Sequence, residues 1–160
     1  MKLQHSLIEK LGNFLDFVPD ESLLKDGILH IDDLQINVSQ LQLDDTASVA
    51  LAAFICPVSP ISLAEVLRLA MSANYCWRGT KGATFSYDPM SENLFLSLNI
   101  TQTTLDTAST AQVGALFLNL FHTAQHWRAV LGQLEFHQTP DYLGQSTLAL
   151  SLGPTARTLQ

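Results

Sequence analysis

The sequence predicts an α+β fold: a largely antiparallel five-stranded sheet with three helices, in the order α-β-β-β-α-β-β-α. Three observations favour this class. Apolar residues recur at helical spacing at the start of the chain, the spacing changes to strict alternation at Ile28, and two more alternating runs follow a second apolar helix pattern. Turn residues separate neighbouring strands, so hairpins and one helical crossover can join all five.

The first predicted element is an amphipathic helix over residues 1–16. Its apolar positions have helical spacing and are Leu3, Leu7, Leu11, Phe14 and Leu15. The segment "VPDESLLKDG" follows, and its proline and glycine predict a break rather than a continuation of the helix. A helix with one apolar stripe is expected to pack that stripe on a sheet.

Three strands are predicted next, over residues 28–31, around Leu34, Ile36 and Val38, and over residues 47–56. The acidic pairs Asp32-Asp33 and Asp44-Asp45 fall between these strands. Paired carboxylates can serve acid/base chemistry or a cation site, but aspartate is also a common turn residue. Because the loops lack the glycine and glutamate of a calcium loop, we interpret both pairs as turns.

A second helix is predicted over residues 60–75, with Ser59 as N-cap and Pro60 at the first helical position. Its polar residues form one narrow stripe, and the rest of its surface is apolar. Such a helix is expected to be buried on more than one side, and the second side would be covered by another copy of the chain. The predicted homodimer interface comprises Leu63, Val66, Leu67, Ala70, Met71 and Trp77.

A hairpin follows, with Ala83, Phe85 and Tyr87 alternating before the turn at Asp88-Pro89 and a second alternating run from Leu94 to Ile100. The last helix is predicted from about Thr103 to Leu131, with Thr103 and Asp106 as its capping box. We expect one domain over residues 1–136 and a tail over residues 137–160, in which "STLALSL" is a candidate extra strand.

Composition narrows the classes of partner. The 160 residues are 47% hydrophobic but only 14% charged, against about 25% in an average domain, which indicates that part of the surface contacts another protein. The net charge of −7 argues against binding to nucleic acid. No window approaches the roughly 18 apolar residues of a membrane span. Cys56 and Cys76 are interpreted as free buried thiols of a reducing cytosol.

Catalytic and metal-binding patterns are weak. His122 and His126 have the spacing of two metal ligands on one helix face, yet "HTAQH" has no glutamate base and no third ligand is in view. "GTKG" lacks the other residues of a phosphate-binding loop. We therefore expect no metal, no cofactor, no catalytic residue and no enzymatic activity.

A peptide-binding surface is the better hypothesis. The first helix lies beside a sheet whose strands carry apolar residues on both faces, and the helices of one chain cover only one face well. Backbone pairing at a sheet edge and side-chain pockets would together hold an extended peptide. The expected contact residues, some of which would be core, are Leu3, Leu7, Leu11, Leu29, Ile31, Ile36, Val38, Phe54 and Phe95.

Three segments resemble the class I chaperones of type III secretion, the Tir-chaperone or CesT-like family. They are "GILHIDDLQINVSQLQLDD" (residues 27–45), the stretch from "LAEVLRLAMSAN" to "LFLSLNI" (residues 63–100) and "LFLNLFHTAQHWRAVL" (residues 116–131). With the first helix, the resemblance covers about residues 1–135. The tail after Gln138 is longer than is usual in the family.

This resemblance implies a cytoplasmic homodimer of a Gram-negative bacterium. Such a chaperone binds the N-terminal region of an effector protein, keeps it secretion-competent and delivers it to the export apparatus, with the secretion ATPase as a further contact. Two other classes stay open on the sequence: a small-ligand or enzymatic α+β domain, which would need a polar pocket, and a flagellar or adaptor-type binding module, which only its partner would distinguish.

Overall fold

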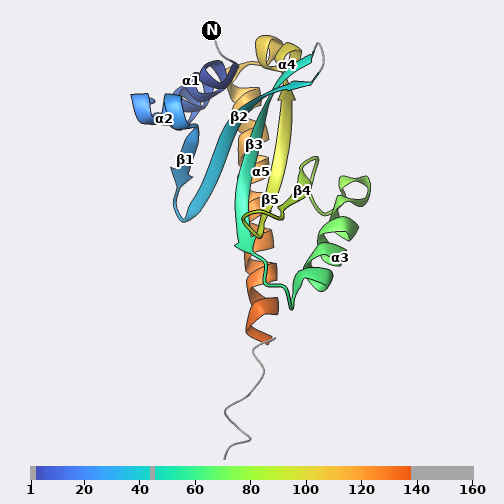
Figure 1. Ribbon diagram of the computed structural model, residues 1–160. Helices are drawn as coiled ribbons and strands as arrows, with labels where there is room; N and C mark the ends of the chain where they lie inside the picture. The colour runs from blue at the N-terminus through green and yellow to red at the C-terminus, as the bar shows by residue number, and fades with distance from the viewer. Residues whose placement is uncertain (1–2, 44–45, 138–160) are drawn as a thin grey trace, which may run out of the picture.

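The computed structural model describes residues 3–43 and 46–137 (Figure 1). The elements, in chain order, are α1 (Leu3–Leu15), α2 (Glu21–Asp26), β1 (Ile28–Ile31), β2 (Leu34–Leu43), β3 (Thr46–Pro57), α3 (Leu63–Asn74), the short 3-10 helix η1 (Tyr75–Trp77), β4 (Thr84–Asp88), β5 (Asn93–Thr101), α4 (Gln102–Thr107) and α5 (Thr110–His137). The α+β class and the five-stranded antiparallel sheet are confirmed. The described residues form five α-helices rather than the three that were predicted.

The first extra helix, α2, lies in the segment that was interpreted as a break. The Asp20 carboxylate accepts a hydrogen bond from the Leu23 backbone N–H at 2.7 Å and so caps the helix start. Gly27 ends it in the left-handed conformation, with φ of 66°, and donates to the Leu23 carbonyl. A six-residue helix is too short to show a periodic pattern, so only these caps mark it in the sequence.

The second extra helix arises because the predicted last helix is two helices that meet at Ala108. Thr101, not Thr103, caps α4 by accepting from the Thr104 N–H. The capping box belongs to the next helix, where Ser109 and Gln112 each accept a hydrogen bond from the other's backbone N–H at 3.2 and 2.8 Å.

Helix α3 begins at Leu63, three residues later than predicted. Ser59 is not its N-cap; residues 60–62 form a turn in which the Ser62 N–H donates to the Ser59 carbonyl. The helical bonds begin with Val66 donating to Ser62. The predicted extra strand in "STLALSL" lies outside the described residues.

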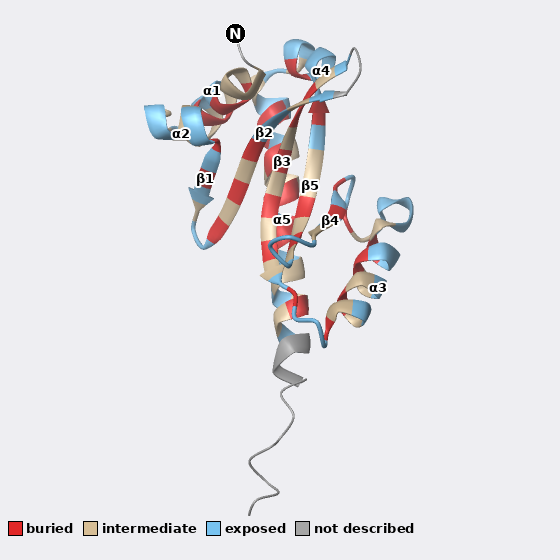
Figure 2. Cartoon of the chain, viewed as in Figure 1, coloured by how far each residue is buried: buried red, intermediate tan, exposed pale blue. Residues whose placement is uncertain are grey.

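The strand order is β1-β2-β3-β5-β4, so β1 and β4 are the outer strands of the described sheet. Ile36 pairs with Ala53, and Ala53 pairs with Leu96 on its other side, so these side chains share one face. Helices α1 and α5 cover that face (Figure 1). The core lies between these two layers, as the buried segments of β2, β3 and β5 show (Figure 2).

The opposite sheet face carries small and polar side chains with one aromatic pair. Phe54 and Phe95 lie opposite each other on β3 and β5, with ring centroids 5.9 Å apart and an interplanar angle of 69°. Both rings are half-buried. No helix of the described chain covers this face, which leaves the pair partly accessible (Figure 1).

Helices α1 and α5 cross closely. A Cβ atom built on Gly114 of α5 would overlap the Phe14 ring of α1, so a larger residue would force that ring to move. The Lys10 ammonium of α1 donates to the carbonyls of Leu105 and Ala108 at 2.6 and 2.8 Å, where α4 ends. Together these contacts join the start of the chain to its last helices.

The first acidic pair is a turn, as predicted, and Asp33 has a second role. Ile31 and Leu34 are paired across the β1–β2 turn, and Asp32 has a φ of 52°, which aspartate tolerates. The Arg128 guanidinium of α5 lies 3.0 Å from the Asp33 carboxylate and donates a hydrogen bond to the backbone carbonyl of Asp33 at 2.9 Å. The hairpin is therefore tied to α5. Asp44 and Asp45 lie outside the described residues.

Candidate protein-binding surfaces

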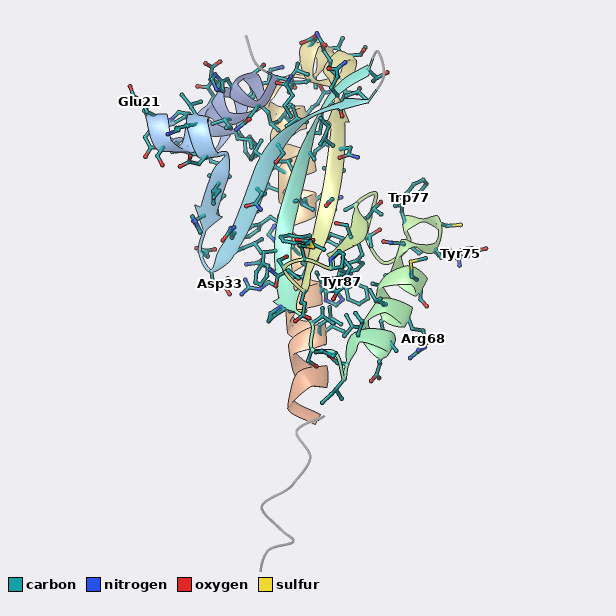
Figure 3. All side chains as sticks on the ribbon, in the orientation of Figure 1. Glu21, Asp33, Arg68, Tyr75, Trp77 and Tyr87 are labelled. Carbon is teal, nitrogen blue, oxygen red and sulfur yellow. The ribbon has the colours of Figure 1, made fainter. Side chains whose placement is uncertain are left out.

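Apart from Met90 in the β4–β5 turn, the large apolar side chains that are exposed in the described chain gather in two places. The first group comprises Ile61, Met71, Tyr75 and Trp77, with exposed fractions of 83%, 69%, 70% and 57%. They lie on α3 and its flanks; Figure 3 shows Tyr75 pointing away from the sheet, whereas the Trp77 indole lies against Thr84 at the start of β4. We call these four residues the projecting surface.

The projecting surface exists because α3 contacts its own chain along one stripe only. Val66, Ala70 and Ala73 are buried and follow one another at helical spacing. The helix packs on the outer strand β4 and on η1, away from α1 and α5 (Figure 1). The opposite side of α3, including Met71, is left for solvent or for a partner.

Asn74 fixes the end of α3 to the outer edge of the sheet. Its side-chain oxygen accepts from the Phe85 N–H at 2.8 Å, and its amide donates to the Phe85 carbonyl at 3.3 Å. One amide side chain thus occupies both backbone groups that Phe85 would offer to another strand.

The two tryptophans lie in different environments. Trp127 of α5 donates to the Gly79 carbonyl at 2.8 Å and meets the Phe85 ring edge-on at a centroid distance of 5.1 Å, which holds the loop after η1 against α5. Trp77 bonds only the Thr84 hydroxyl, at 3.3 Å, and presents most of its ring outward. Cys76, expected to be buried, is exposed beside it.

The residues predicted for a dimer interface divide in the same way. Val66 and Ala70 are buried within the chain, Leu63 and Leu67 are half-buried, and Met71 and Trp77 are exposed. Sequence reasoning missed Ile61 and Tyr75. Both adjoin the apolar helix pattern, and its extension by a few residues on either side is the signal that could have found them.

The second group of exposed apolar residues lies at the other side of the sheet. A hollow of about 620 Å³ opens between the end of α1, the α1–α2 connection and β1. Val18 is 92% exposed and Ile28 is 41% exposed at its rim. We call this hollow the edge groove; its lining residues are Leu15, Phe17, Val18, Asp20, Ser22, Leu23, Ile28, Leu29, His30 and Ile31.

The residues predicted to contact a peptide are not brought together in one place. Leu7, Leu11, Leu29, Ile36 and Val38 are core side chains, although Leu29 also lines the edge groove with Ile31. Leu3 packs half-buried against the core, and the Phe54–Phe95 pair lies on the uncovered sheet face. Sequence reasoning missed Val18 and Ile28, because it treated the segment before β1 as a simple break.

The described residues contain no group of three or more His, Cys, Asp or Glu side chains that could hold a metal ion. His122 and His126 are exposed on α5, beside Phe121 and Trp127 respectively. The Ser91 hydroxyl, the largest cause, and the Met90 N–H lower the pKa of the Asp88 carboxyl by hydrogen bonds in the β4–β5 turn. This bonding belongs to a turn and not to a catalytic pocket.

None of the helices within the described part of the chain is both long and apolar enough to cross a membrane.

The model of the Tir chaperone protein (CesT) family matches residues 6–128. A chain in the structure of the HopA1-SchA chaperone-effector complex is 16% identical, with a TM-score of 0.56, over 79% of this chain and 94% of that one. A chain in the ExsC-ExsE complex is 21% identical, with a TM-score of 0.58, over 82% and 97%. Among curated proteins, none matches significantly.

Proposed function

This chain belongs to the Tir chaperone protein (CesT) family, and from that premise we propose that it is a type III secretion chaperone that binds the N-terminal region of an effector protein. It keeps that region soluble and secretion-competent and delivers it to the export apparatus. The match of the family model to residues 6–128, most of the described fold, is the observation that carries this proposal. The similar fold of chains from two complexes, one of them a chaperone-effector complex, supports it.

The edge groove is the site that suits an extended segment. It combines apolar side chains with β1, a strand at the edge of the described sheet. A segment laid along β1 can pair its backbone with that strand, while alternate side chains enter the groove beside Ile28 and Ile31. Backbone pairing tolerates sequence differences, and the groove provides selectivity.

The projecting surface is the proposed homodimer interface. Burying about 800 Å² on each partner is typical of a stable interface, and four large apolar side chains on and around one helix provide its centre. Leu63 and Leu67, half-buried in the single chain, become fully buried in the dimer. The net charge of −7 disfavours nonspecific association of the remaining surface.

The dimer is tested with Met71→Asp in the full chain. The expected result in light scattering is a monomer at micromolar concentration, because the change places a charge at the centre of the interface. Met90→Asp is the matched control: Met90 is 92% exposed in the β4–β5 turn and should leave the dimer unchanged. A wild-type monomer, or equal behaviour of the two variants, would contradict the interface.

Effector binding is tested by identifying the protein that copurifies from the native cytosol and then measuring the affinity of its N-terminal region. Val18→Asp and Ile28→Asp should each weaken binding at least about tenfold, because each removes apolar burial of roughly 1.5–3 kcal/mol. Met90→Asp again serves as the control. Unchanged affinity with correct folding and dimerisation would place the site elsewhere.

The chain acts in the cytoplasm, it meets the secretion ATPase on delivery, and it turns over no substrate. Incubation of the purified protein with the ATPase, followed by sedimentation, tests the second point. Stoichiometric zinc in protein purified without added metal, lost when His122 and His126 are both changed, would contradict the expected lack of a metal.

A further inference from the structure

A second hollow lies close to the end of the described chain. It measures about 510 Å³ and lies between the last part of β3 and the outward side of α5. We call it the lower groove; its lining residues are Asp33, Phe54, Ile55, Cys56, Pro57, Gln125, Arg128, Ala129 and Gly132.

The lower groove exists because β2, β3 and α5 do not end at the same height along the sheet. The register between β2 and β3 stops at Ile36 and Ala53, while β3 continues to Pro57. The turn that carries Asp33 forms the upper rim, held by its ion pair with Arg128. Helix α5 runs on below that rim (Figure 1). Residues 54–57 of β3 therefore have no partner on the β2 side of the sheet, and they line this gap.

The side of the lower groove that α5 forms carries small residues. A Cβ atom built on Gly132 would meet no atom within 4 Å, and Ala129, one turn earlier, is exposed. Glycine lowers helix stability by roughly 1 kcal/mol relative to alanine. Here no close contact with the described residues requires it, in contrast to Gly114. A small residue at this point leaves room for another segment.

We propose that residues 146–152 of the same chain, "STLALSL", dock into the lower groove with Leu148, Leu150 and Leu152 directed inward. These leucines alternate with small residues, which is the pattern of a strand with one apolar face. Residues 138–160 contain one aspartate and one arginine, so the acidic net charge of the molecule does not repel them.

The connection is long enough. Gly132 precedes the end of α5 by five residues, or about 7.5 Å along a helix. Residues 138–145 span up to about 26 Å when extended, which allows the chain to reverse and return to the groove. Pro140 and Gly144 suit such a reversal. The docked segment would cover Phe54, Cys56 and Pro57, which are half-buried or exposed in the described chain. This inference does not depend on effector binding.

The test uses the full chain with Cys76→Ser, so that Cys56, which lines the groove, is the one remaining thiol. Its rate of alkylation by N-ethylmaleimide is compared with that after Leu150→Asp. The expected result is an increase of about tenfold or more, since burial of one leucine shifts an equilibrium by at least that factor. Thr155→Asp, beyond the docking segment, should leave the rate unchanged.

Disulfide trapping decides the geometry. In the Cys76→Ser background, one of Leu148→Cys, Leu150→Cys and Leu152→Cys, the one that docks beside Cys56, should form an intramolecular disulfide with it under air oxidation, and Ala149→Cys and Ser151→Cys should form much less. Gly132→Leu, which fills the groove at a position with free space, should abolish the difference. Equal yields at all five positions, or disulfides formed only between chains, would overturn docking in the same molecule.

Discussion

Helices α1 and α3 lie at opposite sides of the sheet. They show that the same amphipathic pattern can give a core helix or a helix with an exposed apolar surface. Both are leucine-rich and amphipathic, with 13 and 12 residues. Helix α1 buries Leu7, Ile8 and Leu11 completely, whereas α3 buries only Val66 and two alanines. The large side chains of α3 point outward or lie half-buried. Its apolar surface therefore exceeds what its own chain can cover.

The contacts that hold the two helices to the rest of the fold also differ. Helix α1 is held by side-chain packing against α5 and by the Lys10 bonds to the α4–α5 junction. Helix α3 is held mainly at its end, through Asn74 and the backbone of β4. Helix α1 is part of the core, whereas α3 packs on the outer strand β4 and leaves most of its surface uncovered.

The largest effect that this comparison predicts is that of Leu11→Ala in α1. The substitution should lower the free energy of unfolding by about 2–5 kcal/mol, because Leu11 is 1% exposed and its removal leaves a cavity. Met71→Ala in α3 should change it by no more than about 0.5 kcal/mol at the lowest usable protein concentration, where association contributes least. Urea denaturation of both variants measures the difference. Similar losses would mean that α3 is also core.

The close crossing of α1 and α5 predicts the second effect. Gly114→Ala should destabilise the fold by about 1–3 kcal/mol, because the added methyl group overlaps the Phe14 ring. Gly132→Ala on the same helix is the matched control and should be neutral or stabilising, since the new Cβ meets open space. Thermal unfolding of the pair checks this. Equal shifts in Tm would show that helix propensity, not the crossing, dominates.

The attachment of α3 to β4 through Asn74 predicts an effect of similar size that is confined to the β4 side of the sheet. Asn74→Ala removes two hydrogen bonds and leaves the Phe85 N–H and carbonyl without their partner, at a cost of roughly 1–3 kcal/mol. Hydrogen exchange should show the Phe85 amide losing protection while the amides of β2 and β3 keep theirs. A uniform loss over the whole sheet would mean that α3 unfolds together with the core.

The smallest effect concerns Asp88, in the hairpin on which α3 is mounted. Because hydrogen bonds from Ser91 and Met90 lower its pKa in the folded state, its contribution is present above the unfolded pKa and is lost as the pH falls through the lower, folded value. In Asp88→Asn, the free energy of unfolding should therefore fall slightly less steeply as the pH drops below about 4. Denaturation from pH 6 to pH 2 tests it. A steeper decline in the variant would contradict the assignment.

Much of the fold could be predicted because its signals are local. Alternation located β2, β4 and β5, short apolar runs located β1 and β3, and Asp32-Asp33 located a turn. The N-cap of α4 and the break at Ala108 were missed, because Thr103 and Asp106 imitate a capping box that Ser109 and Gln112 form instead. The site was harder. Leu11 is buried and Val18 is exposed. This difference depends on which segments pack together, and periodicity alone does not reveal it.

The strand order has a consequence for valency. If two copies associate through their α3 sides, each edge groove lies four strand spacings, about 19 Å, from the β4 edge of its own subunit. A single ligand that fills both grooves must then bridge at least about 38 Å, or roughly 12 extended residues, in addition to the segments that it inserts. A shorter ligand can saturate the assembly only at two molecules per dimer. Ligand length therefore selects between stoichiometries of one and two.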